Sequence, residues 1–403
     1  MSLADKLKNK KLRQPQPQRK GPVWGGPEKE GITFSLLSRF LTCRERFRIL
    51  VVEGLKPVER WNHRIEYGSM WHVCEEAFAS EVRHFKGELN GVDTTLWSDN
   101  LQEYCKKLCQ RYPMDQNDID KWYNVCKVQF PIYAKHWREH PDVVDRTPLL
   151  QEQVFDVPYK LPSGRTVRLR GKWDSVDLIG KGKGAGVYLQ ENKTKGDIEP
   201  EQMQRQLTFD LQTQLYLVAL YEARNQIGKV GTTLFGAGLG KAPILGVRYN
   251  VVRRPLSGGR GTIKQHAPTK SRPMGESKED YYDRLRGIID GSAEDAPGPD
   301  YFFMRWKTEI SKADVDLFRK RCLDPVLEGL CNWWHYIMEG LALDKDDPWQ
   351  GSGSIIGHAL HWQHPFGCVN TIDEYGYSDL DEFLRSGSEV GLARTQNLFP
   401  ELQ

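Results

Sequence analysis

The sequence predicts an α/β protein, because helical and strand patterns occupy separate stretches of one chain. In the first third, apolar residues recur at helical spacing, and Trp71, Cys74 and Phe78 form one stripe of a predicted helix over residues 64–84. Alternating apolar residues separated by turn residues then fill residues 154–193, as is typical of strands. The sequence therefore predicts a sheet with helices packed against it.

Length and composition narrow the class of protein without identifying it. A chain of 403 residues can form two or three structural units, or one domain with large insertions. Hydrophobic residues make up 39% and charged residues 28%, which excludes disordered, collagen-like and coiled-coil proteins. The formal net charge is only +3, so any contact with nucleic acid must come from local basic patches.

The first 30 residues predict a flexible basic tail, since they are rich in Lys, Arg, Gln and Pro and hold almost no apolar residue before Val23. No apolar run has the length of a signal peptide or a membrane span. Eight cysteines are spread too thinly for a secreted disulfide scaffold, and we expect them to be reduced. These features favour a cytoplasmic protein with no membrane partner.

The remaining elements follow from periodicity, caps and turns. A helix is expected from Phe34 to Phe47, and the turn Pro162-Ser163-Gly164 predicts a hairpin. The glycine-rich stretch 180–186 is a connecting loop before a further strand. Other helices are expected in two segments within 95–138 and at 201–224, 279–289 and 312–339, and another strand at 244–253.

Three charged residues on neighbouring strands suggest phosphodiester chemistry. Asp174 lies on one strand, and Glu191 and Lys193 lie on the next, where antiparallel pairing can bring the two carboxylates together. Glu191 and Lys193 point to the same face because they are two residues apart. Two carboxylates suit Mg²⁺ or Mn²⁺, and a lysine can stabilise a developing hydroxide. Such a pattern also arises by chance in unrelated hairpins.

Flanking motifs strengthen the catalytic interpretation. On the helix over 64–84, His72 and Glu76 share a face, and Gly68 permits close approach of another backbone. The imidazole of His72 could complete a metal site, although a lone histidine on a helix is more often a structural residue. Gln212 and Tyr216, at i and i+4 on the next helix, could brace Lys193 or touch the substrate backbone.

In this order, the motifs resemble the RecB-like branch of the PD-(D/E)XK nuclease superfamily. The resemblance runs from about residue 35 to 254 and rests on Ser38 to Cys43, Gly68/His72/Glu76, Gly171 to Asp177, Glu191 to Lys193 and Gln212/Tyr216. It implies an α/β core, with a central mixed sheet flanked by helices and with helical N-terminal and C-terminal additions. It also implies that His72, Asp174, Glu191 and the Asn192 carbonyl hold the metal, and that Lys193 is the catalytic lysine.

The resemblance also gives a domain division. After the basic tail of residues 1–30, we expect a nuclease core at 31–275 with a helical insertion at about 90–140. A mainly helical region should fill 276–403. The pair Trp333-Trp334 and Trp362 make a protein-interaction module an alternative for that last region, although buried core is the commoner use of tryptophan.

Cysteine and histidine placement argues against other metal centres. Several relatives hold an iron–sulfur cluster with one cysteine in the first helix and three near the C-terminus. Here Cys43 is in place, but Cys368 stands alone downstream, so no iron–sulfur cluster is expected. His358, His361, His364 and Cys368 are zinc ligands by type, but their spacing does not converge on one helix face.

The sequence thus predicts a Mg²⁺- or Mn²⁺-dependent nuclease acting on double- or single-stranded DNA. By family analogy, it is an exonuclease of recombination, repair or phage DNA processing in a bacterial or phage-infected cell, working with a strand-annealing or other recombination protein. The alternatives are an endonuclease of the same fold and a non-catalytic nucleic-acid-binding scaffold. The basic stretch from Arg248 to Arg272 could grip phosphates as a mobile loop, or be a solvated insertion.

Overall fold

The chain divides into two compact units, and the larger one carries the sheet. The smaller unit comprises residues 1–26, 38–58 and 339–398, and the larger comprises 27–37, 59–338 and 399–403. The computed structural model describes residues 22–42, 44–84, 95–138, 140–208, 210–225, 242–256, 263–270, 273–343, 392–395 and 397–402.

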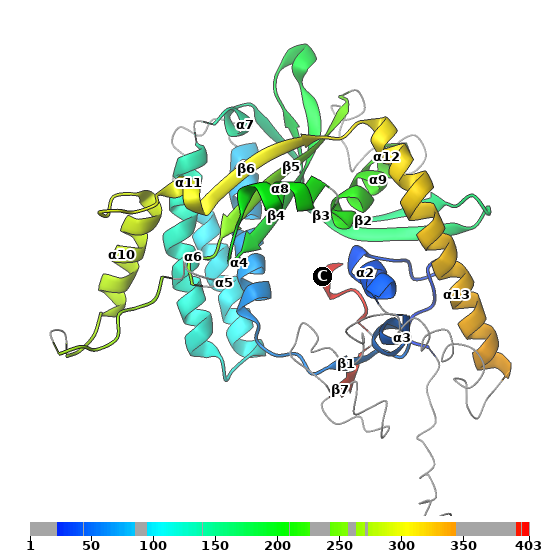
Figure 1. Cartoon of the computed structure of the whole chain (residues 1–403), viewed down its shortest axis with the longest axis horizontal. Coiled ribbons are helices and arrows are strands. Elements are labelled where there is room, and N and C mark those ends of the chain that lie inside the picture. The colour runs from blue at the N-terminus through cyan, green and yellow to red at the C-terminus, as the bar shows by residue number, and fades with distance from the viewer. Residues whose placement is uncertain are drawn as a thin grey trace, which may run out of the picture. The chain divides into compact units, whose positions relative to one another are not determined.

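The larger unit is built on a five-stranded mixed sheet in the order β2-β3-β4-β5-β6 (Figure 1). Its strands are β2 (Arg146–Lys160), β3 (Thr166–Ile179), β4 (Gly186–Lys195), β5 (Ile244–Arg253) and β6 (Phe303–Glu309). The β4–β5 pair is parallel, and the other neighbours are antiparallel. The predicted α/β fold with a central mixed sheet is therefore confirmed.

Helices pack on both faces of this sheet, α4 on one face and α8 and α9 on the other. The helices described after residue 59 are α4 (His63–His84), α5 (Leu96–Arg111), α6 (Gln116–Trp137), α7 (Pro141–Val144), α8 (Pro200–Thr208), α9 (Leu211–Asn225), α10 (Lys278–Asp290), α11 (Pro299–Phe302), α12 (Lys312–Phe318) and α13 (Asp324–Leu343). Short 3-10 turns lie at Gly182–Gly184 and Pro400–Leu402, and a π-helical turn, Arg319–Leu323, joins α12 to α13. On β5, Tyr249 donates to the Leu207 carbonyl of α8, while Asn250 donates to Glu75 of α4.

Helices α4, α5 and α6 pack together through aromatic side chains. The Trp71 ring of α4 lies 5.2 Å from Phe130 and 5.0 Å from Tyr133, both on α6. Cys74 and Cys126 are buried in this apolar cluster as free thiols, with sulfur atoms 3.9 Å apart. This packing holds α4, which carries His72, in a fixed position.

A buried ion cluster joins four neighbouring strands. Asp177 of β3 accepts from Arg248 of β5 at 2.6 Å and lies 2.8 Å from the Nε of Arg146 on β2. The same Arg248 guanidinium donates to Gln190 of β4, and Asp177 is fully buried. Slippage of β2, β3 or β5 by a residue would leave a charge unpaired in the core, and slippage of β4 would remove the amide that accepts from Arg248.

Several elements differ from the sequence expectation. The helix expected at 201–224 is two helices, because Asp210 accepts from the backbone and hydroxyl of Thr213 and caps the start of α9. The strand β6 was not expected, whereas the helix expected from residue 312 does begin there, behind a capping box of Ser311 and Asp314. Arg248 falls both in the strand expected at 244–253 and at the start of the basic stretch, and the structure buries it fully in β5.

The smaller unit holds a two-stranded antiparallel pair, β1 (Leu55–Pro57) with β7 (Leu392–Arg394). The helix expected at 34–47 is formed as α2 (Phe34–Thr42) and α3 (Arg44–Phe47), followed by a π-helical turn at Arg48–Val52. The Phe47 ring meets Trp24 edge-on at 5.2 Å. Among the helices that the structure describes in either unit, none is long and apolar enough to cross a lipid bilayer.

We predict that Asp177→Asn destabilises the protein by about 3–5 kcal/mol, because it leaves two buried guanidiniums without their carboxylate. Urea denaturation of the metal-free protein measures this free energy. Glu59→Gln is the matched control, since it breaks the exposed pair with Arg111, which should contribute below about 1 kcal/mol. Equal losses in the two variants would contradict a special role for the buried cluster.

Candidate active site

Asp174 lies at the point where β3 and β4 separate. The last paired residues of these strands are Ser175 and Gln190, and beyond them the strands diverge. There the Asp174 carboxylate accepts a hydrogen bond from the Asn192 backbone at 2.8 Å, in place of a strand-to-strand bond. The side chain is thereby held in the opening between the two strands.

Glu191 and Lys193 lie on one face of β4, as predicted from their spacing. The Lys193 ammonium donates to Glu191 at 3.0 Å and to the Gln212 side chain of α9 at 2.8 Å. Burial lowers the pKa of Lys193, but the carboxylates of Glu191, Asp174 and Asp210 outweigh it and raise the pKa above its ordinary value. Lys193 is therefore a positively charged group fixed beside two acids.

Glu191 has one carboxylate oxygen free for a cation. Its side chain is fully buried, and its Oε1 has no hydrogen-bond partner among the described residues, while Oε2 is bound by Lys193. Burial and the nearby charge of Asp174 raise the pKa of Glu191 to about 7, against the opposing effect of Lys193. An oxygen anion buried without a partner is costly, and a hard divalent cation is the kind of ligand that removes this cost.

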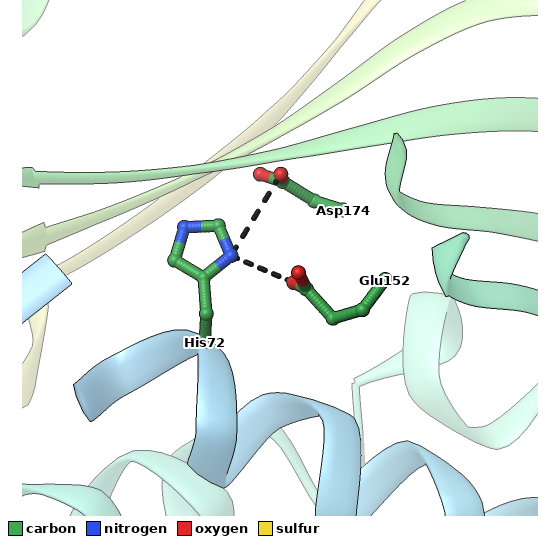
Figure 2. A group of neighbouring side chains, drawn as sticks. All are labelled: His72, Glu152 and Asp174. Carbon is green, nitrogen blue, oxygen red and sulfur yellow. Dashed lines mark hydrogen bonds and ion pairs between the residues drawn. The ribbon is translucent and has the colours of Figure 1, made fainter. Parts of the chain in front are cut away.

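His72 reaches this site from α4. A Cβ added at Gly68, one turn earlier, would lie 3.3 Å from the Thr194 hydroxyl, so the glycine lets α4 approach β4 closely. The His72 Nδ1 lies 3.7 Å from Asp174 and 2.8 Å from Glu152 (Figure 2). The three side chains offer ligand atoms that all lie within 4.8 Å of one another.

Glu152 is a member of this cluster that sequence analysis missed. It lies on β2 between Gln151 and Gln153, whose partners on β3 are Ser175 and Trp173, so it stands opposite Asp174. The three consecutive polar residues hide the strand, whose visible apolar alternation begins at Val154. The sequence signal available was an acidic residue shortly before an apolar strand, which is too common to select.

Other predicted residues lie at the edge of this arrangement. Tyr216 packs edge-on against Phe155 at 5.3 Å, and its carbonyl accepts from Trp173. A Cβ at Gly171 would clash with Phe155 and lie 3.0 Å from Tyr216, so the absence of a side chain at Gly171 makes room for these two aromatic rings. The Asn192 side chain accepts from Gln190, on the opposite face of β4 from Glu191.

Some expected features lie outside the described residues. They include Cys43, the possible zinc ligands His358, His361, His364 and Cys368, and parts of the basic stretch at 257–262 and 271–272. Of that stretch, Arg253 and Arg254 are buried, whereas Lys264 and Lys270 are exposed. Neither a phosphate-gripping loop nor a solvated insertion describes Arg248 and Arg253, which lie in β5, the strand expected at 244–253.

Comparison with protein families identifies the superfamily of this chain. The family model of the PD-(D/E)XK nuclease superfamily matches residues 32–305, about two thirds of the chain, and spans every residue from His72 to Gln212 described above. A search of curated proteins found no match to this chain.

The charge of His72 predicts a pH dependence of the metal-free protein. Burial lowers the pKa of His72, but the charge of Asp174 and the hydrogen bond to Glu152 outweigh it and raise the pKa from 6.5 to about 9. Protonated His72 therefore stabilises the fold fully below pH 6.5, and this contribution is lost as the pH rises to about 9.

We expect the free energy of unfolding, measured in EDTA, to fall between pH 7 and 9, and to fall less in His72→Gln. Ionisation of Glu191 lowers the stability of the fold over a lower pH range, because its folded pKa of about 7 exceeds the ordinary value of 4.5. This loss of stability is nearly complete by pH 7. Identical pH profiles for wild type and His72→Gln above pH 7 would show that His72 is neutral in the folded state.

Proposed function

This chain belongs to the PD-(D/E)XK nuclease superfamily, and we propose that it is a Mg²⁺- or Mn²⁺-dependent nuclease that hydrolyses DNA phosphodiester bonds. The observation that carries the proposal is the placement of Asp174, Glu191 and Lys193 together where β3 and β4 separate. These are two carboxylates for a cation and one fixed ammonium beside them. A nucleic-acid-binding protein of this fold that had lost catalysis would not need to keep all three of these residues.

The donor set fits a hard divalent ion. Asp174, Glu191 and the Asn192 carbonyl offer oxygen, and His72 offers an imidazole nitrogen; oxygen-rich sets of this kind suit Mg²⁺ and Mn²⁺. The unpartnered Oε1 of buried Glu191 supports the assignment. When bound, such an ion polarises the scissile phosphate and lowers the pKa of water.

Lys193 supplies positive charge where the reaction creates negative charge. Its ammonium is held by Gln212 on one side and by Glu191 on the other, so it needs little rearrangement to face a phosphate oxygen or an attacking water. A donor fixed in advance stabilises the transition state more than the ground state. Gln212 acts as the positioning residue for this lysine, while Tyr216 remains a candidate contact for the substrate.

The finer assignment is an exonuclease of the RecB-like branch, working in recombination, repair or phage DNA processing in the cytoplasm of a bacterial or infected cell. The order of the His72, Asp174, Glu191–Lys193 and Gln212 motifs supports this branch. A strand-annealing or other recombination protein is the proposed partner. An endonuclease of the same fold is the second candidate, since these residues set the chemistry and not the choice of DNA end.

The decisive experiment incubates the purified chain with linear duplex, covalently closed circular and single-stranded DNA, in Mg²⁺, Mn²⁺ or EDTA. We expect cleavage in both metals and none in EDTA, with linear DNA degraded and closed circles intact. Cleavage of closed circles would make the enzyme an endonuclease.

Asp174→Asn and Glu191→Gln should each abolish cleavage while the far-UV circular dichroism stays unchanged. A variant of either kind with near-normal activity would contradict the assignment of the site.

Lys193→Ala should slow single-turnover cleavage by about two to three orders of magnitude, because the lost contact is made mainly in the transition state. DNA affinity measured in Ca²⁺ should change little. Lys193→Arg should recover little activity, since a planar guanidinium does not replace a compact ammonium. The exposed Lys264→Ala is the control for loss of one positive charge. If Lys193→Ala failed only through weaker DNA binding, the lysine would be a phosphate clamp.

A further inference from the structure

We propose that Glu152 is a ligand of the divalent cation, contributed by β2 and acting together with His72 and Asp174. The proposal rests on the proposed metal-dependent function and adds a residue to its site. It makes the site a meeting point of a helix and three strands, since His72 comes from α4, Glu152 from β2, Asp174 from β3 and Glu191 from β4.

The distances around the His72 Nδ1 fit a shared cation. This nitrogen lies 2.8 Å from a Glu152 oxygen and 3.7 Å from an Asp174 oxygen. Neighbouring ligands on an ion with bonds of about 2.1 Å stand roughly 3 Å apart, and opposite ligands about 4 Å. The three ligand atoms, all within 4.8 Å of one another, need only small movements to surround one ion.

A single divalent cation can contact all three groups of this cluster, whereas the single proton on His72 cannot. The Nδ1 of His72 carries a single N–H, which donates to one acceptor, yet two carboxylates face it (Figure 2). A divalent ion in place of that proton would contact both carboxylates and the nitrogen lone pair at once. The hydrogen bond between His72 and Glu152 is then the metal-free arrangement of the same three groups.

The backbone of Glu152 is held in an unusual conformation that supports a functional role. Its φ is +45°, in the left-handed region that non-glycine residues avoid. Such strain persists where surrounding contacts fix it, and it concentrates at functional sites. Here the contacts are those of its two carboxylate oxygens, one to His72 and the other to Lys172 at 2.7 Å.

A second observation on β4 points to a cation. The buried Glu191 Oε1 has no partner within the described part of the chain, and Asp174 lies close enough for its charge to raise the pKa of Glu191. Asp174 therefore stands between two further carboxylates, Glu152 on one strand and Glu191 on the other. Three acids in such proximity favour binding of positive charge.

The test measures Mn²⁺ affinity of the full-length chain by titration calorimetry, without DNA. We compare wild type, Glu152→Gln, His72→Gln and the double variant. Glu103→Gln is the control for loss of one acid, because Glu103 is an exposed residue of α5 outside the site. We expect Glu152→Gln to weaken Mn²⁺ binding by about tenfold or more, and Glu103→Gln to change it little.

The double variant separates ligation from positioning. If Glu152 binds the ion directly, Glu152→Gln should weaken Mn²⁺ binding again in the His72→Gln background. If Glu152 only orients His72, Glu152→Gln should not change Mn²⁺ affinity in the His72→Gln background, and that result overturns the proposal. Glu152→Asp gives a second test that keeps the charge: the shorter side chain withdraws the oxygen, so affinity should also fall, and unchanged affinity would contradict ligation.

Cleavage of linear DNA by the same samples separates the two proposals. Suppose that the wild type binds Mn²⁺ and cleaves DNA, and that Glu152→Gln has normal Mn²⁺ affinity. That result overturns the role of Glu152 as a ligand and leaves the proposed nuclease function standing. Wild type that neither binds Mn²⁺ nor cleaves overturns the proposed function as well. Thermal unfolding in EDTA confirms that each variant is folded before its affinity is compared.

Discussion

The buried carboxylate of Asp177, shared by Arg146 and Arg248, constrains the arrangement of the whole sheet. A charge in the core is tolerated only when its partners meet it with correct geometry, so the strands that supply them have one acceptable register. Gln190 joins the same cluster from β4. The cluster therefore aligns β2, β3, β4 and β5, and the position of every other side chain on these strands follows.

The same alignment positions the proposed site, which lies where β3 and β4 separate and is reached by His72 from α4 and by Gln212 from α9. Asp174 precedes by three residues the aspartate that anchors the cluster, and Glu191 directly follows Gln190. Asp177 and Gln190 lie on the face of the sheet that packs against α4. Because side chains alternate along a strand, Glu191 then faces α8 and α9 on the opposite side. Beyond Ser175 and Gln190 the strands separate, and Asp174 takes the Asn192 amide that would otherwise lack a partner.

The sequence predicted those parts of the site that depend on local spacing. Glu191 and Lys193 share a face because strands have a period of two, and His72 follows Gly68 by one helical turn. Glu152 and β6 depend on pairing between distant segments, which no local pattern records. The sequence places Arg248 both in the strand at 244–253 and in a basic stretch, and the choice between the two depends on its burial with Asp177, which is a tertiary property.

The site is electrostatically unfavourable without a cation, and this links its chemistry to the stability of the fold. Burial raises the pKa of both Asp174 and Glu191, so the folded chain resists the ionised state that a metal requires. Lys193 and protonated His72 offset part of this unfavourable charge. A bound cation would relieve the rest, free His72 from its proton and leave Lys193 as the fixed positive charge beside the phosphate. The same residues can therefore serve as the ion pairs of the metal-free protein and as the groups that act on DNA.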